Sequence, residues 1–264
     1  MNNDKRLFNA SCFALVTTAM TFAVRAKIEL VFNNDYGLTL EQIGIAFGPA
    51  FYGFTLAMII GGFLVDLFGM KKIMNLAFIG HLVGIVLTLF ARDFWMLFSG
   101  TLLIGIGNGM VEAACNPLIA TLYPKEKTKM LNRFHVWFPG GIVIGSILGY
   151  LIVDIMGMSW MVLVGTLIVP LVIYIYLFKG QEFPATERVA KSGHPIPLPV
   201  ILGLYALEEI LVDLSKQGKT IYLVDLQKQP RYMMERVEMV PKLIPQDNIY
   251  DNYKKCFAFI KKTH

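Results

Sequence analysis

The sequence predicts a mainly α, integral membrane protein: a six-helix transmembrane bundle followed by a small α/β tail on the cytoplasmic side. The first observation is composition, because 55% of the 264 residues are hydrophobic and only 16% are charged, against about 45–50% and about 25% in soluble domains. The second is a set of six long apolar segments. The third is a change to polar, mixed patterning after residue 199.

Each of the six apolar segments is close to or longer than the ~20 residues that a helix needs to cross the hydrocarbon layer. Because the connections between them are short, neighbouring helices should be antiparallel. The expected domains are a bundle over 1–179, a cytoplasmic linker over 180–199 and a tail over 200–264. The expected spans are 7–32, 44–68, 73–91, 94–122, 136–153 and 159–178.

Basic residues gather in alternate loops, which orients the bundle. The positive-inside rule puts both termini in the cytoplasm of a multi-pass protein of the cell (inner) membrane. The net charge is +5, and the basic residues cluster beside the spans. The expected partner is therefore the lipid bilayer and not nucleic acid. The orienting residues are Lys5, Arg6, Lys71, Lys72, Lys125, Lys127, Lys129, Arg133 and Lys179.

The fourth span carries an acidic residue in an apolar helix. Asn108, Glu112 and Asn116 repeat every four residues and therefore share one helix face. An acidic side chain at mid-bilayer costs roughly 2.5–3.5 kcal/mol unless it meets a polar cavity or partner. The stripe is interpreted either as the wall of a solute or proton path, or as a polar contact between helices.

The first span also carries charge toward its outer end. Arg25 and Glu29 are four residues apart, so they can pair along one helix face. Arg25 either faces the cavity and binds an anionic or hydroxylated solute or, like Lys27, extends to the membrane interface.

The loop after the second span reads Gly-x-x-x-Asp-x-x-Gly-x-Lys-Lys, with Gly62, Asp66, Gly69, Lys71 and Lys72 at its marked positions. Gly69 permits a sharp turn there. Because it lies in the loop between the second and third of six spans, the pattern resembles the signature loop of the major facilitator superfamily. The resemblance implies that the six spans form half of a major facilitator fold.

A second group of residues extends this resemblance. Asn108, Glu112 and Asn116, followed by Asn132 and His135 after a short basic loop, resemble the fucose-permease-like sugar:proton symporter branch. In that branch the helix-four glutamate is implicated in proton coupling and sugar binding, so the resemblance implies these roles for Glu112. The chain departs from the wider family at Thr101, where many members carry arginine.

The tail is expected to contain a helix at Ala206–Gln217 closed by Gly218, a strand at 219–226, a helix at 229–240 and a helix at 249–262 capped by Asp247. The run 196–207 is too short to be a seventh span. The pattern resembles the second half of a STAS domain, the cytoplasmic module of sulfate transporters. The loop that usually precedes its first helix is replaced by Leu202–Tyr205.

Together these features predict a major-facilitator half-transporter for proton-coupled uptake of a sugar or similar small polar solute, acting as a homodimer or with a separate second half. The alternatives are a truncated or fused protein that does not transport, and a membrane-anchored regulatory module that acts through its tail. No phosphate-binding loop, zinc spacing or serine-nucleophile motif occurs. We therefore expect neither enzymatic activity nor a metal or cofactor.

Overall fold

The computed structural model describes residues 3–186, 189, 198–236 and 239–263. The chain divides into two compact units, Met1–Thr186 and Glu187–His264.

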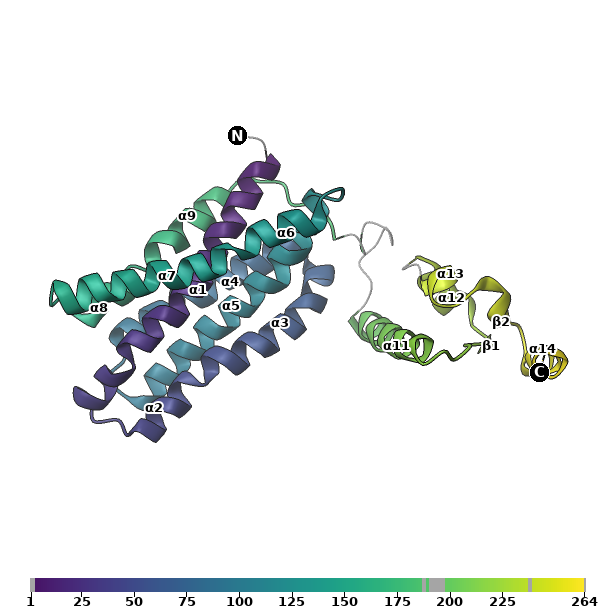
Figure 1. Cartoon of the computed structure of the whole chain (residues 1–264), viewed down its shortest axis with the longest axis horizontal. Helices are drawn as coiled ribbons and strands as arrows, with labels where there is room; N and C mark the ends of the chain where they lie inside the picture. Colours follow the sequence, from purple (N-terminus) through teal and green to yellow (C-terminus); the bar gives the residue numbers. More distant parts are fainter. Residues whose placement is uncertain (1–2, 187–188, 190–197, 237–238, 264) are drawn as a thin grey trace. The chain divides into compact units, whose positions relative to one another are not determined.

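The first unit is a bundle of long helices lying side by side (Figure 1). Six helical stretches of the described residues are long and apolar enough to cross a membrane, which confirms the predicted six-helix architecture. They are α1 (Asn3–Asn34); α2 (Leu40–Phe47) with α3 (Pro49–Phe68); α4 (Met70–Phe90); α5 (Phe94–Leu122); α6 (Lys127–His135) with α7 (Trp137–Gly149) and the π-helix η1 (Tyr150–Ile155); and α8 (Trp160–Gly165) with α9 (Ile168–Phe178).

The helix boundaries have local chemical causes. At the start of α2, Thr39 and Gln42 form a capping box, which satisfies backbone N–H groups that lack helical partners. At the start of α5, the carboxylate of Asp93 accepts a hydrogen bond from the Met96 backbone N–H at 3.0 Å. Between α3 and α4, Gly69 has a φ of +83°, a left-handed conformation that glycine adopts without steric cost.

Helix α5 packs against both α3 and α4, while α1 packs against α5, α7 and α9. Glycine makes the closest of these contacts possible. A Cβ atom on Gly107 of α5 would lie 2.6 Å from His81 Cδ2 on α4, and one on Gly141 of α7 would lie 2.9 Å from the Val16 carbonyl oxygen on α1. Small residues thus let these backbones approach closely, as membrane helices commonly do.

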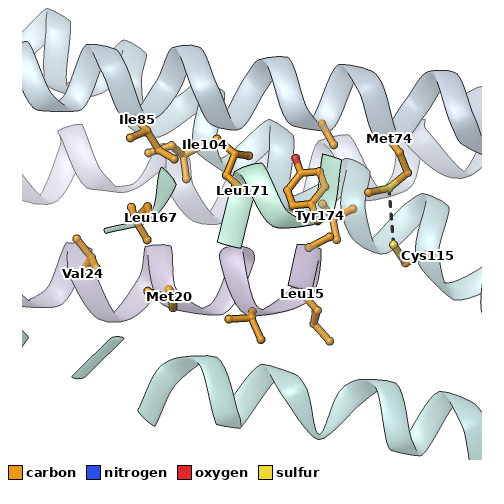
Figure 2. Close-up of a cluster of buried hydrophobic side chains, with 14 of the residues drawn as sticks. Leu15, Met20, Val24, Met74, Ile85, Ile104, Cys115, Leu167, Leu171 and Tyr174 are labelled. Atoms are coloured by element: carbon orange, nitrogen blue, oxygen red, sulfur yellow. Dashed lines mark hydrogen bonds between the residues drawn. The ribbon is translucent and has the colours of Figure 1, made fainter. Parts of the chain in front are cut away.

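An apolar core lies between α1, α4, α5 and α9. Figure 2 shows Tyr174 among side chains that include Leu15 and Leu171, and beside them the thiol of Cys115 facing Met74. The Cys115 Sγ–Met74 Sδ distance is 3.6 Å. All three cysteines are buried and free, and within the spans Cys12 and Cys115 serve as small apolar residues.

The second unit is small and contains one parallel pair of strands. Residues Leu223 and Val224 of β1 pair with Ile249 and Tyr250 of β2, and two helices lie between the strands in sequence. Its elements are α11 (Leu198–Lys216), β1 (Leu223–Val224), α12 (Lys228–Arg236), α13 (Met239–Lys242), the 3-10 helix η2 (Gln246–Asn248), β2 (Ile249–Tyr250) and α14 (Tyr253–Thr263).

The tail prediction is partly wrong in its boundaries. The strand expected over 219–226 is only two residues long, and the helix expected from residue 249 begins at Tyr253 because 249 and 250 are extended in β2. Asn252 caps α14 in place of Asp247, accepting a hydrogen bond from the Lys255 backbone N–H at 3.0 Å. Gly218, with a φ of +70°, follows α11 as expected. Residues 196 and 197 of the short apolar run lie outside the described residues.

Candidate functional site

Glu112 and Asn116 form a hydrogen-bonded pair on α5. Glu112 is 8% exposed, and its Oε2 accepts a hydrogen bond from Asn116 Nδ2 at 2.9 Å. The four-residue spacing on a helix brings the two side chains together. Asn116 Oδ1 is buried and has no hydrogen-bond partner in the described part of the chain. The pair therefore contains one hydrogen bond and one buried acceptor that is not used.

His135 and Asn132 lie on α6, which packs against α5. Both side chains are exposed, and His135 interacts electrostatically with Glu112. The expected basic loop between the fourth and fifth spans is shorter than predicted, because α6 already begins at Lys127. Helix α6 thus brings an imidazole toward the Glu112 carboxylate.

Asn108, the third member of the predicted stripe, belongs to a different cluster. It is fully buried, and its Oδ1 lies 2.8 Å from His81 Nε2 on α4. Asn108 Nδ2 donates to Thr21 Oγ1 on α1 at 3.0 Å. His81 Nδ1 in turn lies 3.3 Å from the Tyr174 hydroxyl on α9. The predicted stripe therefore divides into an enclosed group around Asn108 and a separate pair at Glu112.

The sequence analysis missed His81, Thr21 and Tyr174. A usable signal existed for His81, since it is a histidine in the middle of the 21-residue apolar helix α4, and ionisable residues inside spans usually face the bundle interior. Tyr174 and Thr21 carried no such signal, because Tyr174 lies 93 residues from His81 in sequence and Thr21 lies 87 residues from Asn108.

Arg25 lies against aromatic rings of the second span. Its guanidinium carbon is 4.8 Å from the Phe51 ring centroid and 5.8 Å from that of Phe47, within cation–π range. Arg25 and Glu29 are spaced for pairing, but no ion pair joins them among the described residues. Lys27, expected to extend to the interface, binds Asp154 at 2.6 Å.

The buried Nε of Arg25 has no hydrogen-bond partner among the described side chains and backbone. It borders a cavity of about 20 Å³ whose lining includes Thr21, Thr88 and Thr101, which is enough space for about one water molecule. A larger hollow, of about 110 Å³, lies between α1, α6 and α7 and is lined by Phe8, Asn9, Cys12, Phe13, Val16, Arg133 and Trp137.

The signature loop has the geometry that its residues suggest. Asp66 is buried and accepts a hydrogen bond from Thr186 Oγ1 at 2.6 Å. Lys71 donates to the Gln181 carbonyl oxygen at 3.2 Å, whereas Lys72 is exposed and Gly62 is half-buried. The loop after α3 is thus bound to the segment that follows α9.

Comparisons with known proteins agree with this architecture. The sequence model of the Major Facilitator Superfamily matches residues 8–226. The chain is 25% identical over 202 residues to "Probable anion transporter 6, chloroplastic" of Arabidopsis thaliana, covering 72% of this chain and 36% of that protein. It is 27% identical over 127 residues to "Myo-inositol transporter 1" of Candida albicans, covering 48% and 23%. The chain therefore spans well under half the length of these curated relatives.

A solved structure supports the same fold. A bacterial homologue of the human drug peptide transporters PepT1 and PepT2 matches with a TM-score of 0.60 at 16% identity, covering 77% of this chain and 47% of that structure. Three observations indicate the same family. They are the six spans, the turn at Gly69 between the second and third spans, and the match of the family model over residues 8–226. The chain belongs to the Major Facilitator Superfamily of membrane transporters and is not an enzyme.

Proposed function

We propose that the six-helix unit is half of a secondary transporter that moves a small hydroxylated solute, such as a sugar or polyol, together with a proton. Glu112 carries this proposal, because an 8% exposed carboxyl in a membrane helix is costly, and acids in such positions usually mark a solute or proton path. Asn116 is its direct partner, and His135 has an electrostatic influence on it.

The groups around Glu112 suit a hydroxylated solute. Asn116 Oδ1 is a buried acceptor without a partner in the described chain, so a hydroxyl group can donate to it. Asn132 and His135 add exposed amide and imidazole groups on α6, and the hollow beside that helix combines Asn9, Arg133 and Trp137. The name of the inositol transporter relative is consistent with a polyol. Arg25 makes an anionic solute the competing substrate class.

The proposal includes a second six-helix half, supplied by another copy of the chain or by a separate half. Substrate sites of such transporters lie between two structural repeats. Apolar side chains that would meet a partner or lipid are exposed on α3 and α7, including Phe51, Leu56, Val143 and Ile147.

The decisive experiment is solute uptake into vesicles that contain the full chain, driven by an imposed pH gradient and tested with inositol, monosaccharides and inorganic anions. Glu112→Gln should abolish proton-driven uptake, since an amide cannot carry the proton. Glu41→Gln is a matched control because Glu41 is an exposed carboxylate in the first turn of α2, and it should leave uptake unchanged. Anion uptake alone would overturn the substrate class, and no uptake in any oligomeric state would favour the protein that does not transport.

We propose in addition that the second unit is a partial STAS-like module that regulates transport. In its favour, β1 and β2 pair in parallel with α12 and α13 between them, an arrangement of strand, helix and strand that such modules contain. Removing residues 200–264 should change the uptake rate of protein that is still inserted in the membrane. Unchanged uptake would contradict a regulatory role.

A further inference from the structure

Four side chains from four transmembrane helices form one continuous chain of hydrogen bonds through the bundle core. The order is Tyr174 of α9, His81 of α4, Asn108 of α5 and Thr21 of α1. All four are between 0% and 6% exposed. Thr21 ends the chain by donating to the Thr18 carbonyl oxygen at 2.6 Å.

The direction of every bond follows from this end. Thr21 has a single hydroxyl hydrogen, which it donates to the Thr18 carbonyl oxygen, so Thr21 Oγ1 must accept from the Asn108 amide nitrogen. The amide is then oriented with Oδ1 toward His81, at 2.8 Å from Nε2. Because Oδ1 can only accept, His81 Nε2 must carry the hydrogen.

The other ring nitrogen completes the assignment. In a neutral imidazole with a hydrogen on Nε2, Nδ1 is an acceptor, so the Tyr174 hydroxyl must donate to it across 3.3 Å. A cationic His81 would instead donate from Nδ1 to the phenol oxygen. The hydroxyl hydrogen of Tyr174 would then have no acceptor among the described residues, in a site that is fully buried.

We propose that His81 is a positioning residue that, as the neutral Nε2–H tautomer, fixes α4 and α9 to α5 and α1 so that these helices move as one body. Asn108 lies one helical turn before Glu112 on α5. Holding Asn108 from both sides therefore fixes the rotation of α5 and the direction in which Glu112 points. This proposal rests on the proposed transport function only where it concerns Glu112.

The close packing at Gly107 supports the specific need for a ring nitrogen at this position. A Cβ atom at residue 107 would lie 3.0 Å from His81 Nε2 and 2.6 Å from Cδ2. The absence of a side chain lets the imidazole lie directly on the α5 backbone, where its edge reaches Asn108.

Three variants separate the hydrogen bond from simple packing. His81→Gln keeps an amide N–H close to the position of Nε2, His81→Asn keeps an amide too short to reach Asn108, and His81→Leu removes all polarity. In lipid nanodiscs, His81→Gln should lower the thermal midpoint least, because it keeps the hydrogen bond to Asn108 and loses only the acceptor for Tyr174. Each of the other two variants should lower the midpoint by about 2–4 °C more than His81→Gln does. Equal midpoints for Gln, Asn and Leu would overturn the proposal.

The tautomer itself is measured by solid-state NMR of the full chain labelled with ¹⁵N-histidine. The spectrum of the wild type minus that of His81→Gln isolates His81 from the other three histidines. The expected signal has a protonated Nε2 and an unprotonated Nδ1, and a cation or the opposite tautomer would overturn the assignment.

Vesicle uptake then separates this inference from the proposed function. Transport by His81→Gln but not by His81→Asn supports the positioning role, and equal transport by both contradicts it. If the wild-type chain transports nothing, the proposed function fails, while the midpoints and the NMR signal still decide the role of His81.

Discussion

Two polar groups that lie one turn apart on α5 differ in how completely their hydrogen-bonding atoms have partners. Asn108 is 0% exposed, and both its amide oxygen and its amide nitrogen have partners on other helices. Within the described residues, Glu112 bonds only to Asn116 of its own helix, and Asn116 Oδ1 has no partner. The first group is closed, and the second has an unused acceptor.

The difference indicates which polar residue in a span is structural. A fully bonded network inside an apolar core specifies one arrangement of helices, whereas a partly bonded one is costly and usually has a functional reason. By this criterion Asn108 belongs to helix packing, which was one of the two interpretations of the stripe, and Glu112 with Asn116 remains the candidate for solute and proton.

The largest difference between the two groups is expected when the amide of each is removed. Asn108→Leu should lower the free energy of unfolding by about 2–4 kcal/mol, because it leaves hydrogen-bonding groups of His81 and Thr21 unpaired in the core. Asn116→Leu should cost less, since it removes one hydrogen bond in place of two and also removes the unsatisfied acceptor Asn116 Oδ1. Denaturant unfolding in detergent measures both, and equal losses would contradict the distinction between a closed and an open group.

A smaller effect is expected from crowding the closed group without removing a hydrogen-bonding atom. Gly107→Ala forces His81 away from α5 and should cost about 1–3 kcal/mol, as overpacking of a dense core does. Gly140→Ala is the matched control, because a Cβ atom there would have nothing within 4 Å. The same unfolding measurement should find the control unchanged, and an unchanged Gly107→Ala would show that α4 and α5 can separate freely.

The smallest effect belongs to a polar pair outside the core. Lys27 and Asp154 bind at 2.6 Å, with side chains 34% and 41% exposed. A double-mutant cycle with Lys27→Met and Asp154→Asn should give a coupling of about 0.2–1 kcal/mol that falls as salt is added. A coupling as large as the loss expected for Asn108→Leu would mean that exposure does not separate the two kinds of contact.

Much of the fold was predictable because its signals are local. Apolar segments of about 20 residues indicated the spans, and the glycine after Asp66 indicated the turn between α3 and α4. The Glu112–Asn116 contact followed from a four-residue spacing on one helix. The tail was harder, because a two-residue strand such as β1 is stabilised by β2 about 25 residues later, and its ends cannot be inferred from its own residues.

The spans, the family and the presence of an acid inside a membrane helix follow from the sequence, since each depends on residues close together in the chain. The joining of Asn108 to His81, Thr21 and Tyr174, without Glu112, becomes evident only in three dimensions. The physical reason is that a hydrogen bond between helices depends on how each helix is rotated about its axis, and packing of glycines such as Gly107 against neighbouring backbones sets that rotation.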